Sequence, residues 1–214
     1  MQRIFYLGMP KTGTKSFGSF LENLGYERQS HLWLPNVVIH NNWQEILRRI
    51  EKTGKCVFDD TPWHAFYRQI NDRFPESKFV FHEREEMNWL DSYTMHEVDS
   101  LAKIFLQGKL NKAKRDVLST IFGAPTIIGN VSKYLAAYRE HSKQVRKFFA
   151  GSDRFLEVDL FHDPNVSSKI CEFIGYKGKF PEQMVWNNKK QQRYQNSNYN
   201  PWVKLRNDAK NLFG

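Results

Sequence analysis

Short apolar runs alternate with longer stretches of helical periodicity along most of the chain. The apolar runs lie at residues 3–7, 55–58, 78–81 and 154–158, and each is followed by polar or turn-forming residues. Short runs of this kind, without polar alternation, are typical of strands buried on both faces of a parallel sheet. The pattern therefore predicts four strands.

The stretches between these runs carry apolar residues at the three- and four-residue spacing of one helix face. The predicted helices lie at residues 17–24, 43–50, 62–74, 86–106, 130–149 and 166–174. Strands that alternate with helices predict an α/β fold, in which helices cover both faces of a parallel β-sheet. Such sheets bind ligands at the carboxyl ends of their strands, so the residues after each strand form the candidate site.

The composition is that of a folded, basic protein. Of the 214 residues, 40% are hydrophobic and 26% are charged, which excludes global disorder, and the formal net charge of +9 favours an anionic partner. No apolar run approaches the ~18–20 residues of a membrane span, and the first residues lack the pattern of a signal peptide. The two cysteines make neither a disulfide framework nor a zinc site. We therefore expect a single-domain cytoplasmic protein with no bound metal.

The turn after the first predicted strand, residues 8–16, has the composition of a phosphate-binding loop. It reads GMPKTGTKS and opens the first predicted helix. Such a turn gathers backbone N–H groups, and the helix N-terminus adds about half a positive charge. Gly13 lets the backbone approach an anion closely, and Lys11 adds a full charge. The hydroxyl groups of Thr14 and Ser16 are further donors.

The loop is nearly a Walker A loop, G-x-x-x-x-G-K-[ST], but lacks its lysine. Gly8 and Gly13 have the required spacing, whereas Thr14 occupies the lysine position. Lys15 follows one residue late and would project about 100° round the helix from the required direction. The sequence therefore indicates a phosphate-type loop that is not a true ATPase loop.

The segment FYLGMPKTGTKS resembles the phosphosulfate loop of sulfotransferases, which use 3′-phosphoadenosine 5′-phosphosulfate (PAPS) and release the desulfated product PAP. The resemblance implies that Lys11 and the backbone amides after it bind the 5′-phosphosulfate, helped by the last hydroxyl residue of the loop. Lys15 stands at a position that varies in the family, and we include it in the predicted set. That set of donor-binding residues is Lys11, Thr12, Gly13, Thr14, Lys15 and Ser16.

A second motif of the family binds the 3′-phosphate of the donor through an arginine after a strand and a serine eight residues later. In the segment KFVFHEREEMNWLDSY these positions are Arg84 and Ser92, and Trp89 also matches the family pattern. Eight residues are roughly two helical turns, so the serine returns to the side from which the arginine leaves. Glu85 and Glu86 replace the aspartate and proline of the family, which changes the start of the helix but not the phosphate ligands.

Weaker likenesses extend the resemblance over most of residues 1–180, whereas residues 180–214 match poorly. The resemblance implies a P-loop NTPase-like sulfotransferase fold and one domain over residues 1–214, in which the tail at 180–214 is the least certain part. The basic stretch at 187–193 is the nearest candidate for a segment that closes over the donor. The acceptor, a small molecule or a glycan, carries no recognisable signature.

Sulfuryl transfer needs a cation near the leaving phosphate and a base near the acceptor. Lys11 is the expected cation. Asp60 matches the D-x-P acid of the family, and His31 lies where a similar subfamily often has a histidine. We rank Asp60 and His31 together as catalytic candidates, ahead of His82 and Asp59. A histidine acts near neutral pH without help, whereas an aspartate needs a raised pKa or better geometry.

Two other interpretations remain open. Residues 56–59, CVFD, look like the Walker B strand of a P-loop kinase or NTPase, whose aspartate would help to hold Mg²⁺. The missing Walker lysine and the second phosphate motif argue against it. The charge and the aromatic content of 15% also suit a non-enzymatic nucleic-acid-binding protein. Its basic residues are dispersed, however, and it has no helix-turn-helix, RRM or zinc signature, so we expect no nucleic-acid partner.

Overall fold

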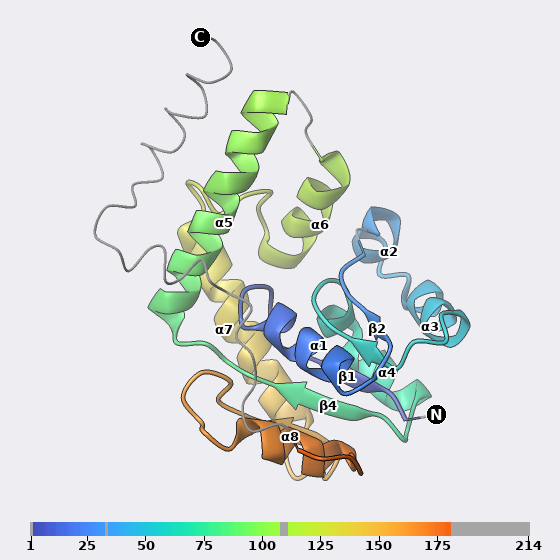
Figure 1. Ribbon diagram of the computed structural model, residues 1–214. Helices are drawn as coiled ribbons and strands as arrows, with labels where there is room; N and C mark the ends of the chain where they lie inside the picture. Colours follow the sequence, from blue (N-terminus) through green and yellow to red (C-terminus); the bar gives the residue numbers. More distant parts are fainter. Residues whose placement is uncertain (1, 33, 108–110, 181–214) are drawn as a thin grey trace.

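A parallel sheet forms the centre of the computed structural model, which describes residues 2–32, 34–107 and 111–180 (Figure 1). Within these residues the sheet has five strands in the order β2-β3-β1-β4-β5, and all neighbours are parallel. The strands are β1 (Ile4–Tyr6), β2 (Arg28–Gln29), β3 (Val57–Phe58), β4 (Lys78–Phe81) and β5 (Phe155–Glu157). All carboxyl ends therefore share one edge, with β1 in the middle.

Helices cover both faces of the sheet, which confirms the predicted α/β class. They are α1 (Thr14–Asn23), α2 (Pro35–Ile39), α3 (Trp43–Lys52), α4 (Tyr67–Arg73), α5 (Glu86–Gln107), α6 (Lys112–Phe122), α7 (Val131–Phe148), α8 (Val166–Ile174) and the 3-10 helix η1 (Trp63–Phe66). The four predicted strands and the six predicted helices are present, except that the helix expected at 62–74 is divided into η1 and α4.

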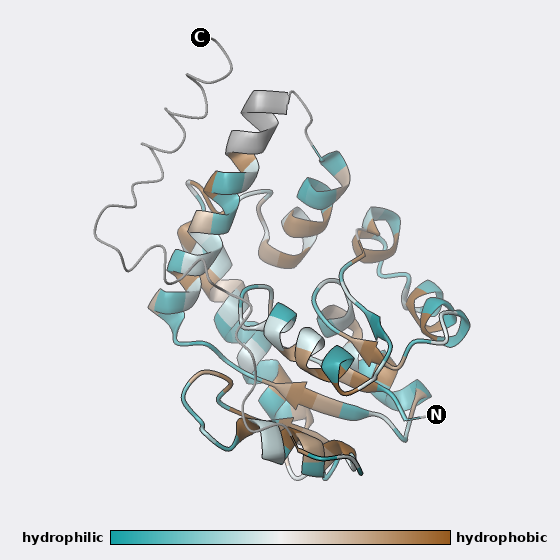
Figure 2. Cartoon of the chain, viewed as in Figure 1, coloured by the Kyte–Doolittle hydropathy of each residue, from teal (hydrophilic) through white to brown (hydrophobic). Residues whose placement is uncertain are grey.

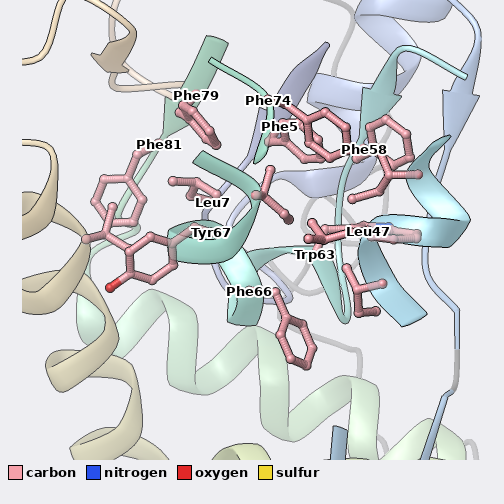
Figure 3. Close-up of a cluster of buried hydrophobic side chains, with 14 of the residues drawn as sticks. Phe5, Leu7, Leu47, Phe58, Trp63, Phe66, Tyr67, Phe74, Phe79 and Phe81 are labelled. Carbon is pink, nitrogen blue, oxygen red and sulfur yellow. The ribbon is translucent and has the colours of Figure 1, made fainter. Parts of the chain in front are cut away.

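Alternation along β1 sends its side chains into two separate cores. Phe5 stacks between Phe58 and Phe79, with ring centroids 4.9 and 5.6 Å away, in the cluster drawn in Figure 3. Ile4 and Tyr6 point to the opposite face, where α1 and α8 pack. In Figure 2 most of β4 is brown, whereas the helices around the sheet carry both brown and teal residues. The sheet is thus buried on both sides, as the apolar runs predicted.

A third cluster, mostly aromatic, joins α5, α6 and α7. Trp89 stacks on Tyr138 with ring centroids 4.1 Å apart, and Phe122 stacks on Tyr134 at 4.2 Å. The indole N–H of Trp89 donates to the carbonyl of Pro10 at 2.9 Å. This cluster therefore supports the loop that follows β1.

The sequence pattern does not predict β2, α2 or α6. β2 consists of two polar residues and exists through its pairing with β3, and α2 has five residues, too few for a periodic pattern. α6 begins after Asn111, whose side chain accepts from the N–H of Lys114, and it ends at Gly123 with a φ of 71°. These two caps are the available signals for α6.

Candidate functional site: an anion-binding edge of the sheet

The backbone carbonyl groups of the loop after β1 accept hydrogen bonds that hold the loop in place. The carbonyl of Met9 accepts from the hydroxyl of Thr12 at 2.6 Å, and that of Thr12 accepts from the hydroxyl of Tyr6 at 2.6 Å. The carbonyls of residues 10, 11 and 13 accept from Trp89, Arg84 and Phe17 at 2.9, 3.4 and 3.0 Å.

A trans peptide directs its N–H opposite to its C=O. The carbonyls of residues 10–12 accept from side chains outside the loop, so the N–H groups that share these peptides are directed the opposite way. The exception is Thr12, whose N–H donates to the carbonyl of Met9 at 3.1 Å. The loop therefore presents backbone donors in the manner of an anion cradle.

Two positions of the loop adopt left-handed backbone conformations. Lys11 has a φ of 76° and Gly13 a φ of 100°. The φ of Gly13 favours glycine, and a Cβ there would lie 2.9 Å from a terminal methyl of Leu160 in the loop after β5, which would have to shift. Lys11 is a non-glycine residue in this region, where surrounding contacts must hold it. The bend it forms is part of the cradle.

The first turn of α1 begins at this loop without a side-chain cap, since its N-cap residue is Gly13. Ser16 is 1% exposed, and its hydroxyl oxygen is buried without a hydrogen-bond partner among the described residues. Thr14 is also buried, and Lys15 is exposed. An uncapped helix start and an unpartnered hydroxyl are what a bound anion would satisfy.

Thr12 has a different role from its neighbours. Its hydroxyl and its N–H are both committed to Met9, and the hydroxyl also lies 3.1 Å from that of Tyr6. Tyr6 is fully buried, and its hydroxyl donates to the carbonyl of Thr12. Thr12 therefore shapes the loop from inside, because both of its donors are engaged by the carbonyl of Met9.

Arg84 brings the second predicted phosphate site to the same edge. It follows β4, is 6% exposed, and donates to the carbonyl of Lys11 at 3.4 Å. Its guanidinium carbon lies 5.2 Å from the ring centroid of Phe161, and its own carbonyl accepts from Tyr138 at 2.6 Å. Burial lowers the pKa of Arg84, and no carboxylate pairs with it among the described residues. A buried charge of this kind needs an anionic partner.

A pocket of about 560 Å³ opens beside this arginine. Its walls come from the end of β4, the start of α5, α7 and the loop after β5; they include Arg84, Tyr138, Asp159, Phe161 and His162. Ser92, the other predicted ligand of this site, is half-buried on the second turn of α5. The structure thus brings Arg84 into contact with the phosphate loop and keeps Ser92 on the helix that starts beside it.

The predicted catalytic candidates of β2 and β3 lie on the opposite side of β1. Asp60 follows β3 with a φ of 69°, is half-buried, and accepts from the N–H of Thr61 at 2.8 Å. His31 follows β2 and is exposed. The N–H of Leu32 donates to the carbonyl of Thr61 at 2.8 Å, so the loops that carry the two candidates are joined.

Asp59 is fully buried in a bidentate ion pair with Arg28 of β2. The guanidinium donates to its two carboxylate oxygens at 2.7 and 2.6 Å. Burial raises the pKa of Asp59 to about 6, although Arg28 opposes the rise. Both oxygens are taken by Arg28, which argues against the magnesium-holding aspartate of a kinase at this position. Sequence reasoning gave no signal for Arg28, because β2 is not predicted.

His82 lies at the end of β4, on the same side of β1 as Arg84. Its Nδ1 is 3.0 Å from the carbonyl of Val158, and its ring packs edge-on against Phe161 at 4.9 Å. Burial lowers the pKa of His82. The ring therefore ties β4 to the loop after β5, and it faces the Arg84 side of the edge rather than the side of Asp60.

The basic stretch at 187–193, and the tail at 181–214 as a whole, lie outside the described residues. Among the residues that the structure describes, no group of three or more histidine, cysteine or acidic side chains is arranged to hold a metal ion. None of the described helices is long and apolar enough to cross a membrane.

A parallel sheet with an anion cradle after its central strand defines the P-loop-like class of α/β proteins. A model of the sulfotransferase domain family matches residues 3–193, and the chain belongs to that family.

The fold is similar to that of solved sulfotransferase structures, of which two are described. A sulfotransferase from Alicyclobacillus acidocaldarius shares 16% identity and a TM-score of 0.54, over 91% of this chain and 90% of that chain, which supports the fold. The sulfotransferase domain from the curacin biosynthetic pathway gives 14% identity and a TM-score of 0.40, over 85% and 76% of the two chains. No curated protein matches the sequence.

Proposed function

We propose that the chain transfers a sulfuryl group from PAPS to a hydroxyl or amine group of a small-molecule or glycan acceptor. Family membership supports sulfotransferase chemistry, and the anion-binding features of the edge support this donor. The observation that carries the proposal is Arg84, a buried guanidinium that has no carboxylate partner among the described residues and contacts the phosphate loop. Arg84 therefore places the proposed 3′-phosphate site beside the loop that we assign to the 5′-phosphosulfate.

The residues present fit a nucleotide with negative charge at both its 5′ and 3′ ends. The uncapped start of α1, Lys11 and the unpartnered hydroxyl of Ser16 suit the 5′-phosphosulfate. Arg84 and Ser92 suit the 3′-phosphate, because a guanidinium offers a charged fork and a serine a neutral donor. When bound, PAPS supplies an activated sulfuryl group on a phosphate leaving group.

Lys11 and the loop amides stabilise the charge that develops on the leaving phosphate. Sulfuryl transfer resembles phosphoryl transfer in having a loose, in-line transition state, so catalysis depends on positioning and on electrostatic stabilisation. The loop donors are already oriented by the carbonyl contacts behind them. They therefore need little reorganisation at the moment of transfer.

We propose Asp60 as the base that takes the acceptor proton. β3 is the direct neighbour of β1, whereas β2, which carries His31, is one strand further, or about 5 Å more from the loop. Asp59 is held by Arg28, and His82 faces the donor side. His31 is the alternative, and it reaches the same acceptor if the side chain turns toward β3.

We further propose that residues 1–214 form one domain and that the tail from 180, with its basic stretch at 187–193, closes over the donor. The cationic residues of this stretch suit a polyanionic nucleotide.

Binding of PAP, ATP with and without Mg²⁺, and AMP, measured by thermal shift, tests the donor. PAP and AMP differ only in the 3′-phosphate, so their difference isolates the Arg84 site. We expect PAP to stabilise the protein most, by RT ln(1 + [L]/Kd), and a chelator to leave this unchanged. Stabilisation by ATP–Mg²⁺ without any by PAP would overturn the proposal. Release of PAP from PAPS in the presence of a panel of phenols, sugars and amines then tests the transfer.

A further inference from the structure

Two histidines, the buried His64 and the half-buried His141, lie between the phosphate loop and the Asp60 turn. His141 of α7 places its Nε2 atom 2.7 Å from the carbonyl of Leu7, the residue directly before the loop. His64 of η1 places its Nδ1 atom 3.3 Å from the carbonyl of Asp60. The two rings pack edge to face with centroids 5.3 Å apart. Together they connect the end of β1 to the end of β3.

The contacts fix the proton on each ring. A carbonyl oxygen only accepts, so His64 carries its proton on Nδ1 and His141 carries its proton on Nε2. Burial lowers the pKa of His64 to about 4 and that of His141 to about 3, so both rings are neutral near pH 7. Each ring is therefore a neutral donor with one defined tautomer.

A histidine at position 64 has an unfavourable effect on the free energy of folding. It is 1% exposed, and its Nε2 atom is buried without a hydrogen-bond partner among the described residues. An apolar side chain of similar size would avoid an unsatisfied buried acceptor. The benefit of histidine at this position is therefore the donor at Nδ1, which is directed at the Asp60 carbonyl.

The backbone that this donor holds is an uncommon one. Asp60 has a φ of 69°, a conformation that a non-glycine residue keeps only where its surroundings enforce it. Trp63, the residue before His64 in η1, donates through its indole N–H to the carbonyl of Ser30 at 3.0 Å. Ser30 directly precedes His31. η1 thus holds the backbone at both candidate bases.

We propose that His64 and His141 are positioning residues, which hold the Asp60 turn in register with the end of β1 so that the base faces the phosphate loop. The proposal rests on the proposed function, with Asp60 as the base. Neither ring touches the reacting atoms. Loss of the pair therefore lowers turnover without removing a ligand of the donor.

The test replaces each histidine in two ways. His64→Leu and His141→Leu remove the donors, whereas His64→Asn keeps a donor near the position of Nδ1 and His141→Gln keeps one near the position of Nε2. His40→Leu, at an exposed histidine after α2, is the matched control. The measurements are PAP affinity, unfolding by urea, and kcat for transfer from PAPS to an acceptor of the panel, or to water if none reacts.

We expect His64→Leu to lower kcat by about 10- to 100-fold, because small displacements of a catalytic group have effects of this size. PAP affinity should stay within about threefold, and His64→Asn should recover most of the loss. The two leucine variants combined should be little worse than one, because the histidines act as a unit. Equal losses in His64→Leu and His64→Asn, or losses in PAP affinity that match those in kcat, would overturn the proposal.

A variant that fails to fold does not decide the question, because nitrogen NMR of the wild-type histidines reads the tautomers directly. Nδ1–H on His64 and Nε2–H on His141, both neutral at pH 6, are the expected states, and any other pair of tautomers would contradict the geometry. Failure of the proposed function is recognised separately, since wild-type protein would then bind no PAP.

Discussion

The two sides of β1 bury opposite charges. Arg84 places a buried guanidinium on the side of β4 and β5, and Asp59 places a buried carboxylate on the side of β3. The carboxylate has a charged partner in Arg28, whereas the guanidinium donates to the carbonyl of Lys11 and has no carboxylate partner among the described residues. A charge left without a charged protein partner is available for a ligand. The comparison supports our proposal that the donor anion binds on the Arg84 side and the acceptor on the Asp60 side, with Lys11 between them.

The largest expected effect tests the acceptor side. Asp60→Asn should lower kcat by about 10²–10⁴-fold, because it removes the proposed base, while PAP affinity stays nearly unchanged. Steady-state transfer from PAPS, with PAP affinity measured in parallel, separates the two quantities. Full activity in Asp60→Asn together with a deep loss in His31→Ala would move the base to His31.

The next effect tests the centre of the edge. Lys11→Ala should lower kcat by about 10²–10³-fold, because it removes a charge that matters most in the transition state. Lys11→Arg should recover only part of this, since a planar fork does not replace a compact ammonium in a tight bend. A loss confined to KM for PAPS would show that Lys11 only binds the donor.

A smaller effect tests the donor side. Arg84→Ala should weaken PAP binding by about 10- to 150-fold, as expected for a charge-assisted pair of ~1.5–3 kcal/mol. AMP, which lacks the 3′-phosphate, should lose much less affinity. Titration calorimetry with both nucleotides measures the difference. Equal losses for PAP and AMP would place Arg84 at the 5′ end of the nucleotide.

The smallest effect compares the two neutral donors of the donor side. Ser16→Ala and Ser92→Ala should each weaken PAP binding by about 2- to 12-fold, the range for one hydrogen bond of ~0.5–1.5 kcal/mol. Only Ser92→Ala should spare AMP, because Ser16 belongs to the 5′ site. Tighter PAP binding in Ser16→Ala would mean that its hydroxyl is not a ligand.

The sequence carries a clearer signal for the residues we assign to the donor side than for the surroundings of Asp59 and Asp60, and the reason is physical. The phosphate loop and Arg84 are local features, because each depends on residues next to one predicted strand. The network around Asp59 depends on Arg28, which lies on a two-residue strand that has no pattern of its own. Such a strand forms because β3 pairs with it, and pairing between distant segments leaves no periodic signal.

The sequence pattern also does not predict the hydrogen bonds that hold the backbone of the site. The apolar runs predict that Tyr6 is buried in a strand, but not that its hydroxyl holds the carbonyl of Thr12. The apolar spacing at residues 130–149 predicts the helix that carries His141, but not the contact of its ring with the carbonyl of Leu7. Both depend on where two elements meet, which a single-chain pattern does not specify.

The carbonyl contacts behind the phosphate loop have a consequence for the rate of ligand capture. The loop is already held by these contacts and has no ordering step of its own to complete, so on our proposal its first encounter with the donor is governed by diffusion and attraction. With a net charge of +9, the protein attracts a polyanionic nucleotide, and such steering falls as ionic strength rises. The nucleotide should therefore arrive quickly in dilute salt and more slowly in concentrated salt, while its departure rate changes less.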